Sequence, residues 1–126
     1  MTSGNAVRAF YKTGAYIADL MEKQEENGRA LVKIRAVIKH PLQGDLHNPK
    51  MTNVPLFHQR KALAEFEKTW VPLSSLKPYE GEIPEYKQSL DEALQKEISK
   101  LTDDESEWAQ LSLEKLLECQ KEYGLM

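Results

Sequence analysis

Apolar and polar positions alternate through the first part of the chain. The clearest case is RALVKIRAVIKH, residues 29–40, in which every even-numbered position before the histidine is apolar. Because successive side chains of a β-strand point to opposite faces, this pattern predicts a strand with one buried face. Weaker alternation predicts earlier strands over residues 6–12 and 16–24, with turns at Thr13-Gly14 and Asn27-Gly28.

A stretch without any period follows, over residues 41–58. Connections longer than about 12–15 residues are uncommon in compact domains and are often functional. Pro41, Pro49 and Pro55 each fix a backbone angle and lower the entropy of the unfolded chain. The segment is therefore predicted to be a stiff, packed loop rather than a flexible linker.

Short strands are predicted again after the loop, over residues 61–67 and 69–71. The run VPLSSLKPY then favours a single tight turn into one more short strand. Five or so short strands with one long loop are typical of a small antiparallel β-barrel. The first part of the chain is therefore predicted to be a barrel over residues 1–80 that carries the loop 41–58.

The period changes to 3.6 residues from Pro84 onward, which predicts helices. Pro84 suits the first position of a helix. Thr102, followed three residues later by Glu105, is a capping-box pattern that predicts the start of a second helix, and Gly124 predicts its end. A helical hairpin over residues 81–126 is expected, and the fold class is mostly β plus α. The apolar stripes consist of Tyr86, Leu90, Leu94, Ile98 and Leu101, and of Trp108, Ala109, Leu113, Leu116, Cys119 and Tyr123.

Composition narrows the class of protein. The chain has 126 residues, 40% of them hydrophobic and 29% charged, which suits one domain with a real core, or one domain with an extension. Cys119 is the single cysteine, so a reducing, cytoplasmic location is expected. The first residues contain neither a signal-like apolar run nor a cysteine, and no run of about 20 apolar residues occurs. We therefore expect neither a lipid anchor nor a membrane span.

Charge is distributed unevenly along a chain whose net charge is −3. Residues 1–78 contain 12 Lys and Arg against 7 Asp and Glu, whereas residues 79–126 contain 5 against 13. Either two surfaces for two partners or acidic helices folded onto a basic barrel would produce this asymmetry. The outward positions of the strand 29–40 form a basic stripe, so a nucleic-acid-binding barrel is one alternative. No aromatic residue alternates with these bases, and the whole chain is acidic, so no nucleic-acid partner is expected. The stripe consists of Arg29, Lys33, Arg35 and Lys39.

All three histidines lie in or beside the loop, within KHPLQGDLHNPKMTNVPLFHQR. With Asp45, they are of the residue types that bind zinc, so a metal-binding protein is a second alternative. However, the spacing of His40, His47 and His58 matches no known ligand pattern, and His40 continues the inward register of the preceding strand. Catalysis is disfavoured because no serine or cysteine lies in a setting that would activate a nucleophile. We expect no metal, cofactor or catalytic residue.

The loop is better suited to structure or to protein recognition. Gly44 permits a sharp bend, and Asp45 and Asn48 are turn formers whose side chains bond nearby backbone amides. Stiff surface loops on a rigid scaffold often carry recognition. The face expected to contact a partner protein consists of His40, Gln43, Asp45, His47, Asn48, His58 and Arg60.

Four runs of sequence are distinctive in combination: YKTGAYIADL, AVIKHPLQGDLHNP, VPLFHQRKALA and KPYEGEIPEYKQSL. Together they resemble the kinase-associated protein B family of spore-forming Gram-positive bacteria, whose members are also called kinase-associated lipoprotein B. The stretch KHPLQGDLHNPK is the most specific part of the resemblance.

The resemblance implies an SH3-like barrel followed by C-terminal helices. It implies a non-enzymatic accessory protein, without a defined active site or cofactor. The implied partner is a membrane-embedded sensor histidine kinase that feeds phosphate into the sporulation phosphorelay. Such a protein would be cytoplasmic and would reach the inner face of the membrane through its partner.

Overall fold

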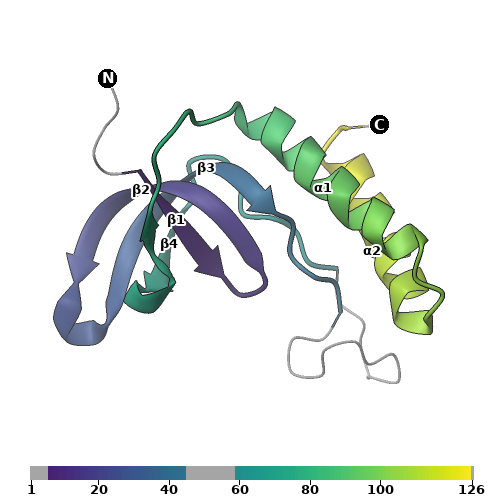
Figure 1. Cartoon of the computed structure of the whole chain (residues 1–126), viewed down its shortest axis with the longest axis horizontal. Coiled ribbons are helices and arrows are strands. Elements are labelled where there is room, and N and C mark those ends of the chain that lie inside the picture. The colour runs from purple at the N-terminus through teal and green to yellow at the C-terminus, as the bar shows by residue number, and fades with distance from the viewer. Residues whose placement is uncertain (1–5, 45–58, 126) are drawn as a thin grey trace.

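The computed structural model describes residues 6–44 and 59–125. An antiparallel sheet of five strands forms its first part, and two helices lie side by side beyond one end of the sheet (Figure 1). The sheet order is β4-β3-β2-β1-β5. The strands are β1 (Ala6–Tyr11), β2 (Gly14–Gln24), β3 (Arg29–Lys39), β4 (Lys68–Pro72) and β5 (Lys77–Pro78), and the helices are α1 (Tyr86–Thr102) and α2 (Glu107–Glu122).

The sheet is curled but open. β4 and β5 are its two edges, yet only the short 3₁₀ helix η2 (Leu73–Ser75) and Leu76 separate them along the chain, so the edges lie near one another. Within the described residues, no ladder joins β4 to β5, and β5 pairs only with Val7 and Arg8. The predicted antiparallel β-fold with a C-terminal helical hairpin is therefore confirmed, except that the sheet stays open where the prediction closed it into a barrel.

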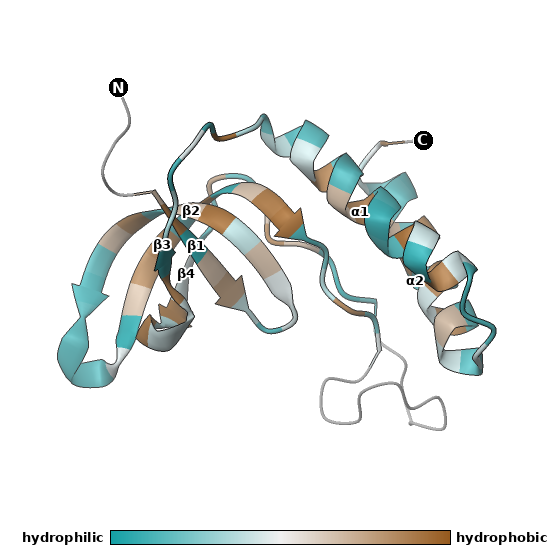
Figure 2. Ribbon diagram, viewed as in Figure 1, coloured by the Kyte–Doolittle hydropathy of each residue, from teal (hydrophilic) through white to brown (hydrophobic). Residues whose placement is uncertain are grey.

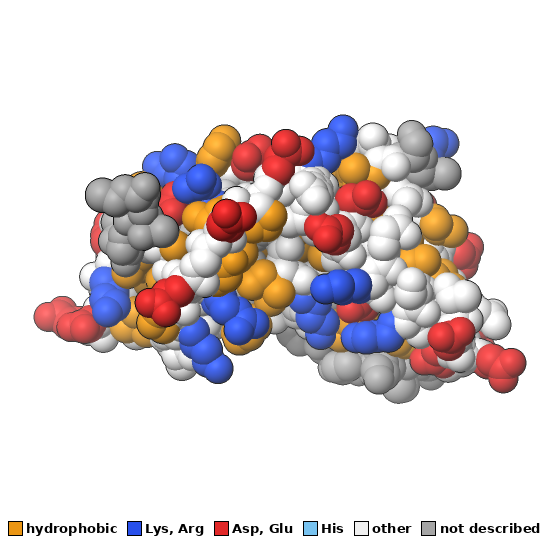
Figure 3. All heavy atoms as spheres, turned by 45° about the horizontal axis from the view of Figure 1, so that its top comes forward, with side chains coloured by type: hydrophobic (Ala, Val, Ile, Leu, Met, Phe, Trp, Pro, Cys, Tyr) orange, Lys and Arg blue, Asp and Glu red, His pale blue; other side chains and the backbone are white. Residues whose placement is uncertain are grey.

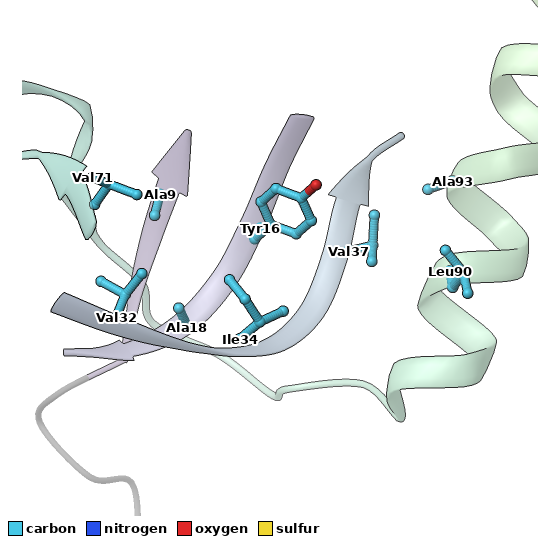
Figure 4. Close-up of a cluster of buried hydrophobic side chains, with 9 residues drawn as sticks. All are labelled: Ala9, Tyr16, Ala18, Val32, Ile34, Val37, Val71, Leu90 and Ala93. Carbon is cyan, nitrogen blue, oxygen red and sulfur yellow. The ribbon is translucent and has the colours of Figure 1, made fainter. Parts of the chain in front are cut away.

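The alternation in β3 produces the core of the sheet. Ala30, Val32 and Ile34 are fully buried. Val32 and Ile34 join residues of β1, β2 and β4 in one cluster, shown in Figure 4. Burial of this kind stabilises the fold by about 25 cal/mol for each Å² of apolar surface removed from water. The strand positions predicted from period-two alternation are confirmed in this part of the chain.

Two bulges alter the pattern near the end of β3. Ala18 pairs with Ile34 but Ile17 pairs with Ala36, and Tyr16 pairs with Val37. The extra residue in β3 shifts its register, so Val37 enters the core in place of Ile38, which the alternation had placed inward. A second register shift follows, because Tyr16 pairs with Val37 whereas Ala15 pairs with Lys39. This shift restores the original alternation of inward and outward positions.

The helices complete the core. Leu90 and Ala93 of α1 pack beside Val37 in the cluster of Figure 4. The Val37 N–H also donates to Ser89 Oγ at 3.0 Å, which satisfies a backbone group at the disturbed end of the sheet. Figure 2 shows apolar positions recurring along α1 and α2, as the 3.6-residue period predicts. The cluster that joins the two helices consists of Leu94, Leu101, Trp108, Ala109 and Leu116.

The helix starts differ from those predicted. α1 begins at Tyr86, two residues after Pro84. The capping-box prediction at Thr102 is wrong, because its hydroxyl donates to the Ile98 carbonyl inside α1 at 2.7 Å. Ser106 caps α2 instead, since its Oγ accepts from the Ala109 N–H at 3.1 Å.

The end of α2 is where the sequence placed it. Gly124 has a φ of 74°, in the left-handed region that terminates many helices. The Gly124 N–H donates to the Lys121 carbonyl, and the Leu125 N–H donates to the Gln120 carbonyl. This pair of bonds defines a Schellman motif. The described part of the chain contains no helix that is both long and apolar enough to cross a membrane.

Residues 61–67 are not a strand, contrary to the prediction. The N–H groups of Ala62 and Leu63 donate to the hydroxyls of Tyr123 and Tyr16 rather than to a neighbouring strand. Phe66 has a φ of 67°, which no regular strand accommodates. The predicted strand over residues 69–71 is confirmed as part of β4.

Candidate functional site

The two ends of the long loop lie beside each other at the end of β3, as Figure 1 shows. We call residues 40–44 and 59–63 the loop base. Three of the residues predicted to contact a partner, His40, Gln43 and Arg60, meet there. The other four, Asp45, His47, Asn48 and His58, lie outside the described residues.

Gln43 holds the two segments of the loop base together. Its side chain is only 5% exposed. The Gln43 Nε2 group donates to the carbonyls of Pro41 (3.0 Å) and Arg60 (2.9 Å), and Oε1 accepts from the Arg60 N–H (2.8 Å). Arg60 returns a bond, since its Nε donates to the Gly44 carbonyl at 3.0 Å. The Gln43 amide thus replaces the backbone hydrogen bonds that would join two paired strands. It satisfies the backbone groups of Pro41 and Arg60 that it bonds.

His40 links the loop base to the end of α2. Its ring is fully buried, with Nδ1 3.0 Å from the Pro41 carbonyl and Nε2 2.9 Å from the Tyr123 hydroxyl. A carbonyl only accepts, so Nδ1 carries the proton and Nε2 accepts from the Tyr123 O–H. The same hydroxyl oxygen accepts from the Ala62 N–H at 2.9 Å. One chain of bonds therefore connects the start of the loop, its end, and the C-terminal helix.

Burial controls the protonation of these groups. Burial lowers the pKa of His40 below its ordinary value, although the Pro41 carbonyl acts in the opposite direction. Burial raises the pKa of Tyr123, and it raises the pKa of Cys119 to about 11. A thiol that stays protonated is a poor nucleophile. The arrangement suits a neutral, rigid scaffold better than proton transfer or nucleophilic chemistry.

Residues of the helices and of β2 that no sequence pattern indicated also fix the loop base. Glu122 forms an ion pair with Lys61 and accepts from Gln59 Nε2 at 2.9 Å. Tyr123 was predicted only as part of the apolar stripe of the second helix, and no role was predicted for Tyr16. Buried tyrosine hydroxyls usually find a hydrogen-bond partner, and this was the one available signal that a segment without a strand partner would pair with them.

The metal alternative gains nothing from the described residues. Among residues 6–44 and 59–125, no three His, Cys, Asp or Glu side chains are grouped so as to hold a metal ion. Both ring nitrogens of His40 are engaged in hydrogen bonds with protein groups. The possible ligands Asp45, His47 and His58 fall outside the described part of the chain.

Two residues of the basic stripe, Arg29 and Lys39, are exposed, and Lys33 and Arg35 are partly exposed. No described ion pair links Arg29, Lys33, Arg35 or Lys39 to α1 or α2, and basic and acidic side chains intersperse over the face of the molecule in Figure 3.

Aromatic residues do lie on this outer face, although the sequence analysis found none. The Arg29 guanidinium sits 4.2 Å from the centre of the Trp70 ring, and Lys33 Nζ sits 5.3 Å from that of Phe66. Arg35 pairs with Asp19 at 2.9 Å. We call these side chains, with Lys68, the β3–β4 face. Its aromatic rings come from β4 and the turn before it, so no period within residues 29–39 indicates them.

Comparisons with known proteins agree with one another. The family model of kinase associated protein B matches residues 11–124. The protein named kinase-associated lipoprotein B from Bacillus subtilis (strain 168) is 49% identical over 121 residues, which is 96% of this chain and 93% of that protein. The X-ray crystal structure of kinase-associated protein B from Bacillus cereus superposes with a TM-score of 0.80 at 35% identity, and the match covers 98% of both chains.

Proposed function

The chain belongs to the kinase-associated protein B family, and on that premise we propose that it is a non-enzymatic accessory protein that binds a sensor histidine kinase. The observation that carries the proposal is the family match over residues 11–124. The names of the relatives associate them with a kinase. The choice of a sensor kinase of the sporulation phosphorelay, and a location at the inner face of the membrane through that partner, extend this premise.

The geometry of the loop base supports a recognition role. Its backbone is fixed by buried bonds through Gln43, His40 and Tyr123, so a partner would meet a surface that is already ordered. Preorganisation lowers the entropy that binding must remove. His40 and Gln43 are buried and would position the contact surface, whereas Arg60 is partly exposed and could touch the partner.

The remaining contact residues stay predictions. Asp45, His47, Asn48 and His58 belong to the same loop, whose two ends the loop base holds in place. We propose that they form the contact together with Arg60.

The proposal is tested by titrating the full chain with the cytoplasmic part of its host's sporulation sensor kinase, by calorimetry at physiological salt. We expect a saturable complex of micromolar affinity or tighter. Asp45→Ala should weaken it about tenfold, as loss of a charged contact at an interface usually does. Arg29→Gln on the β3–β4 face is the matched control and should leave the affinity unchanged. Absence of binding by the unaltered chain would contradict the proposal.

A second candidate function rests on the β3–β4 face. Exposed aromatic rings beside cations are the elements with which small β-folds bind single-stranded nucleic acid, and Phe66 is 54% exposed. We rank this candidate lower, because Glu65 and Glu67 flank that ring and Arg35 is already paired. Retention of the chain on a single-stranded DNA column, falling steeply as salt rises, would favour it. Elution at low salt would dismiss it.

A further inference from the structure

A pocket of about 290 Å³ lies at the loop base, between the β1–β2 turn and residues 59–63. Lys12, Arg60 and Lys61 contribute to its lining, together with the phenol rings of Tyr11 and Tyr16. None of the described residues that line it is an aspartate or a glutamate. Its volume is at the lower limit of ordinary ligand pockets, which suits one side chain or small group rather than a cofactor.

Two of its three cations lack a counter-charge within the described part of the chain. Lys61 is paired with Glu122, but neither Lys12 nor Arg60 forms a described ion pair. Arg60 donates its Nε to the Gly44 carbonyl, which orients the guanidinium. Within the described residues, the other N–H groups of its side chain have no hydrogen-bond partner and can donate to a ligand. The fork of a guanidinium matches the two oxygens of a carboxylate.

The backbone at the pocket rim is strained. Lys12 has a φ of 54°, a left-handed conformation that glycine or asparagine usually occupies in a two-residue turn. Strained positions of this kind concentrate at functional sites, where the surrounding structure holds them. The left-handed conformation places Lys12 at the rim of a pocket that other cations also line.

Tyr16 adds a neutral donor to the pocket. Its hydroxyl accepts from the Leu63 N–H at 3.2 Å, and no described residue accepts its proton. Burial raises the pKa of Tyr16 to about 12, so the phenol keeps that proton. Gly14 makes room for it, since a Cβ at that position would lie 2.6 Å from the hydroxyl oxygen. The hydroxyl can therefore donate to an anion in the pocket.

We propose that this pocket binds a carboxylate side chain from an acidic segment of the partner kinase. The inference rests on the proposed function for its partner, but the pocket itself is defined by this chain alone. The chain's own Glu122 shows the chemistry at the rim, because its carboxylate already binds Lys61 and Gln59. An acidic segment would place a second carboxylate between Lys12 and Arg60.

The pocket is tested without the kinase, by following backbone amide NMR signals of the full chain during titration with acetyl-tetraglutamate amide. We expect saturable shifts at Lys12, Thr13 and Lys61. Acetyl-tetraglutamine amide and inorganic phosphate are the matched probes. Shifts with the glutamine peptide as well, or with phosphate alone, would overturn the carboxylate assignment. The absence of shifts with all three probes would overturn it too.

Variants then separate the pocket from the function. In calorimetry with the kinase, Lys12→Gln and Arg60→Gln should each weaken binding about tenfold, while Lys33→Gln on the β3–β4 face should not. Normal kinase binding by both pocket variants would overturn the pocket and leave the proposed function standing. Acidic-peptide shifts without kinase binding by the unaltered chain would overturn the function and leave the pocket standing. An unchanged unfolding midpoint shows that each variant still folds.

Discussion

The loop base and the β3–β4 face are both rich in cations, but they are built differently. On the β3–β4 face, Arg29 and Lys33 lie over aromatic rings and Arg35 lies beside Asp19. At the loop base, the buried side chains of His40 and Gln43 bond to the Tyr123 hydroxyl and to the Arg60 backbone. The cations of Lys12 and Arg60 lie at a pocket beside them. The comparison shows that the number of cations does not define a site. A site is defined by the groups that hold the cations in place and by the counter-charges available to them.

The same contrast predicts where substitutions matter. A buried group that loses its partner costs its full desolvation energy, whereas an exposed ion pair contributes little. Changes to the hydrogen bonds of the loop base should therefore destabilise the fold, and changes on the β3–β4 face should not.

The largest loss of stability is expected for Gln43→Ala. The change leaves the Arg60 N–H without its partner and removes one hydrogen bond each from the Pro41 and Arg60 carbonyls. It should lower the free energy of unfolding by about 3 kcal/mol. Urea denaturation followed by circular dichroism measures it. Gln59→Ala is the matched control, because within the described residues its side chain bonds only the exposed Glu122. Equal effects of the two changes would show that the loop base is not held through Gln43.

A smaller loss is expected for Tyr123→Phe, which keeps the ring and removes the hydroxyl. The Ala62 N–H and His40 Nε2 then lose their shared partner, and the free energy of unfolding should fall by about 2 kcal/mol. Tyr79→Phe removes an exposed hydroxyl bond to Glu82 and should cost much less. If Tyr123→Phe lowers the free energy of unfolding by less than Tyr79→Phe in the same experiment, the predicted chain of bonds is contradicted.

The protonation of His40 predicts a pH dependence of stability. Burial keeps its pKa in the folded state below the ordinary value of 6.5, so the unfolded chain binds the proton more readily. Stability should be complete above that ordinary value and should decline as the pH falls through it toward the folded pKa, by at most about 1.4 kcal/mol per pH unit.

Denaturation between neutral pH and mild acid measures this slope. The variant His40→Gln should lose the dependence. The double variant His47→Gln with His58→Gln should keep it, because it leaves the buried His40 intact. If His40→Gln keeps the pH dependence and the double variant loses it, His40 is not its source.

The smallest effect is expected on the β3–β4 face. Arg35→Gln removes a partly exposed ion pair with Asp19 and should change the free energy of unfolding by less than about 1 kcal/mol. Raising the salt concentration should reduce even this difference. A loss as large as that of Gln43→Ala would remove the distinction between the two regions.

Local patterns predict the elements of this fold but not what joins them. The alternation of Ala30, Val32 and Ile34 depends only on neighbouring positions, and it predicted the buried face of β3. The bulge that moves Val37 into the core depends on how β2 pairs, which the sequence of β3 does not contain. Thr102 matched a capping box, yet its hydroxyl found a carbonyl within its own helix.

The candidate site follows the same rule. The loop composition predicted a stiff, packed loop over residues 41–58, most of which lies outside the described residues. His40 lies inward, as its register predicts. Its bond to Tyr123, however, joins residues 83 positions apart. Lys12 and Arg60 likewise share a pocket only because the β1–β2 turn folds against the returning end of the loop. Contacts between distant segments of this kind leave no period in the sequence.

Cross-saturation NMR of the labelled chain, bound to the unlabelled cytoplasmic part of the sensor kinase, compares the two regions in one measurement. If the loop base and the β1–β2 turn beside it contact the kinase, the amide signals of Lys12, Thr13 and Lys61 should lose intensity. Those of Arg29 and Lys33 and the Trp70 indole should not. Loss confined to the β3–β4 face, with the loop base unaffected, would contradict the proposed contact surface.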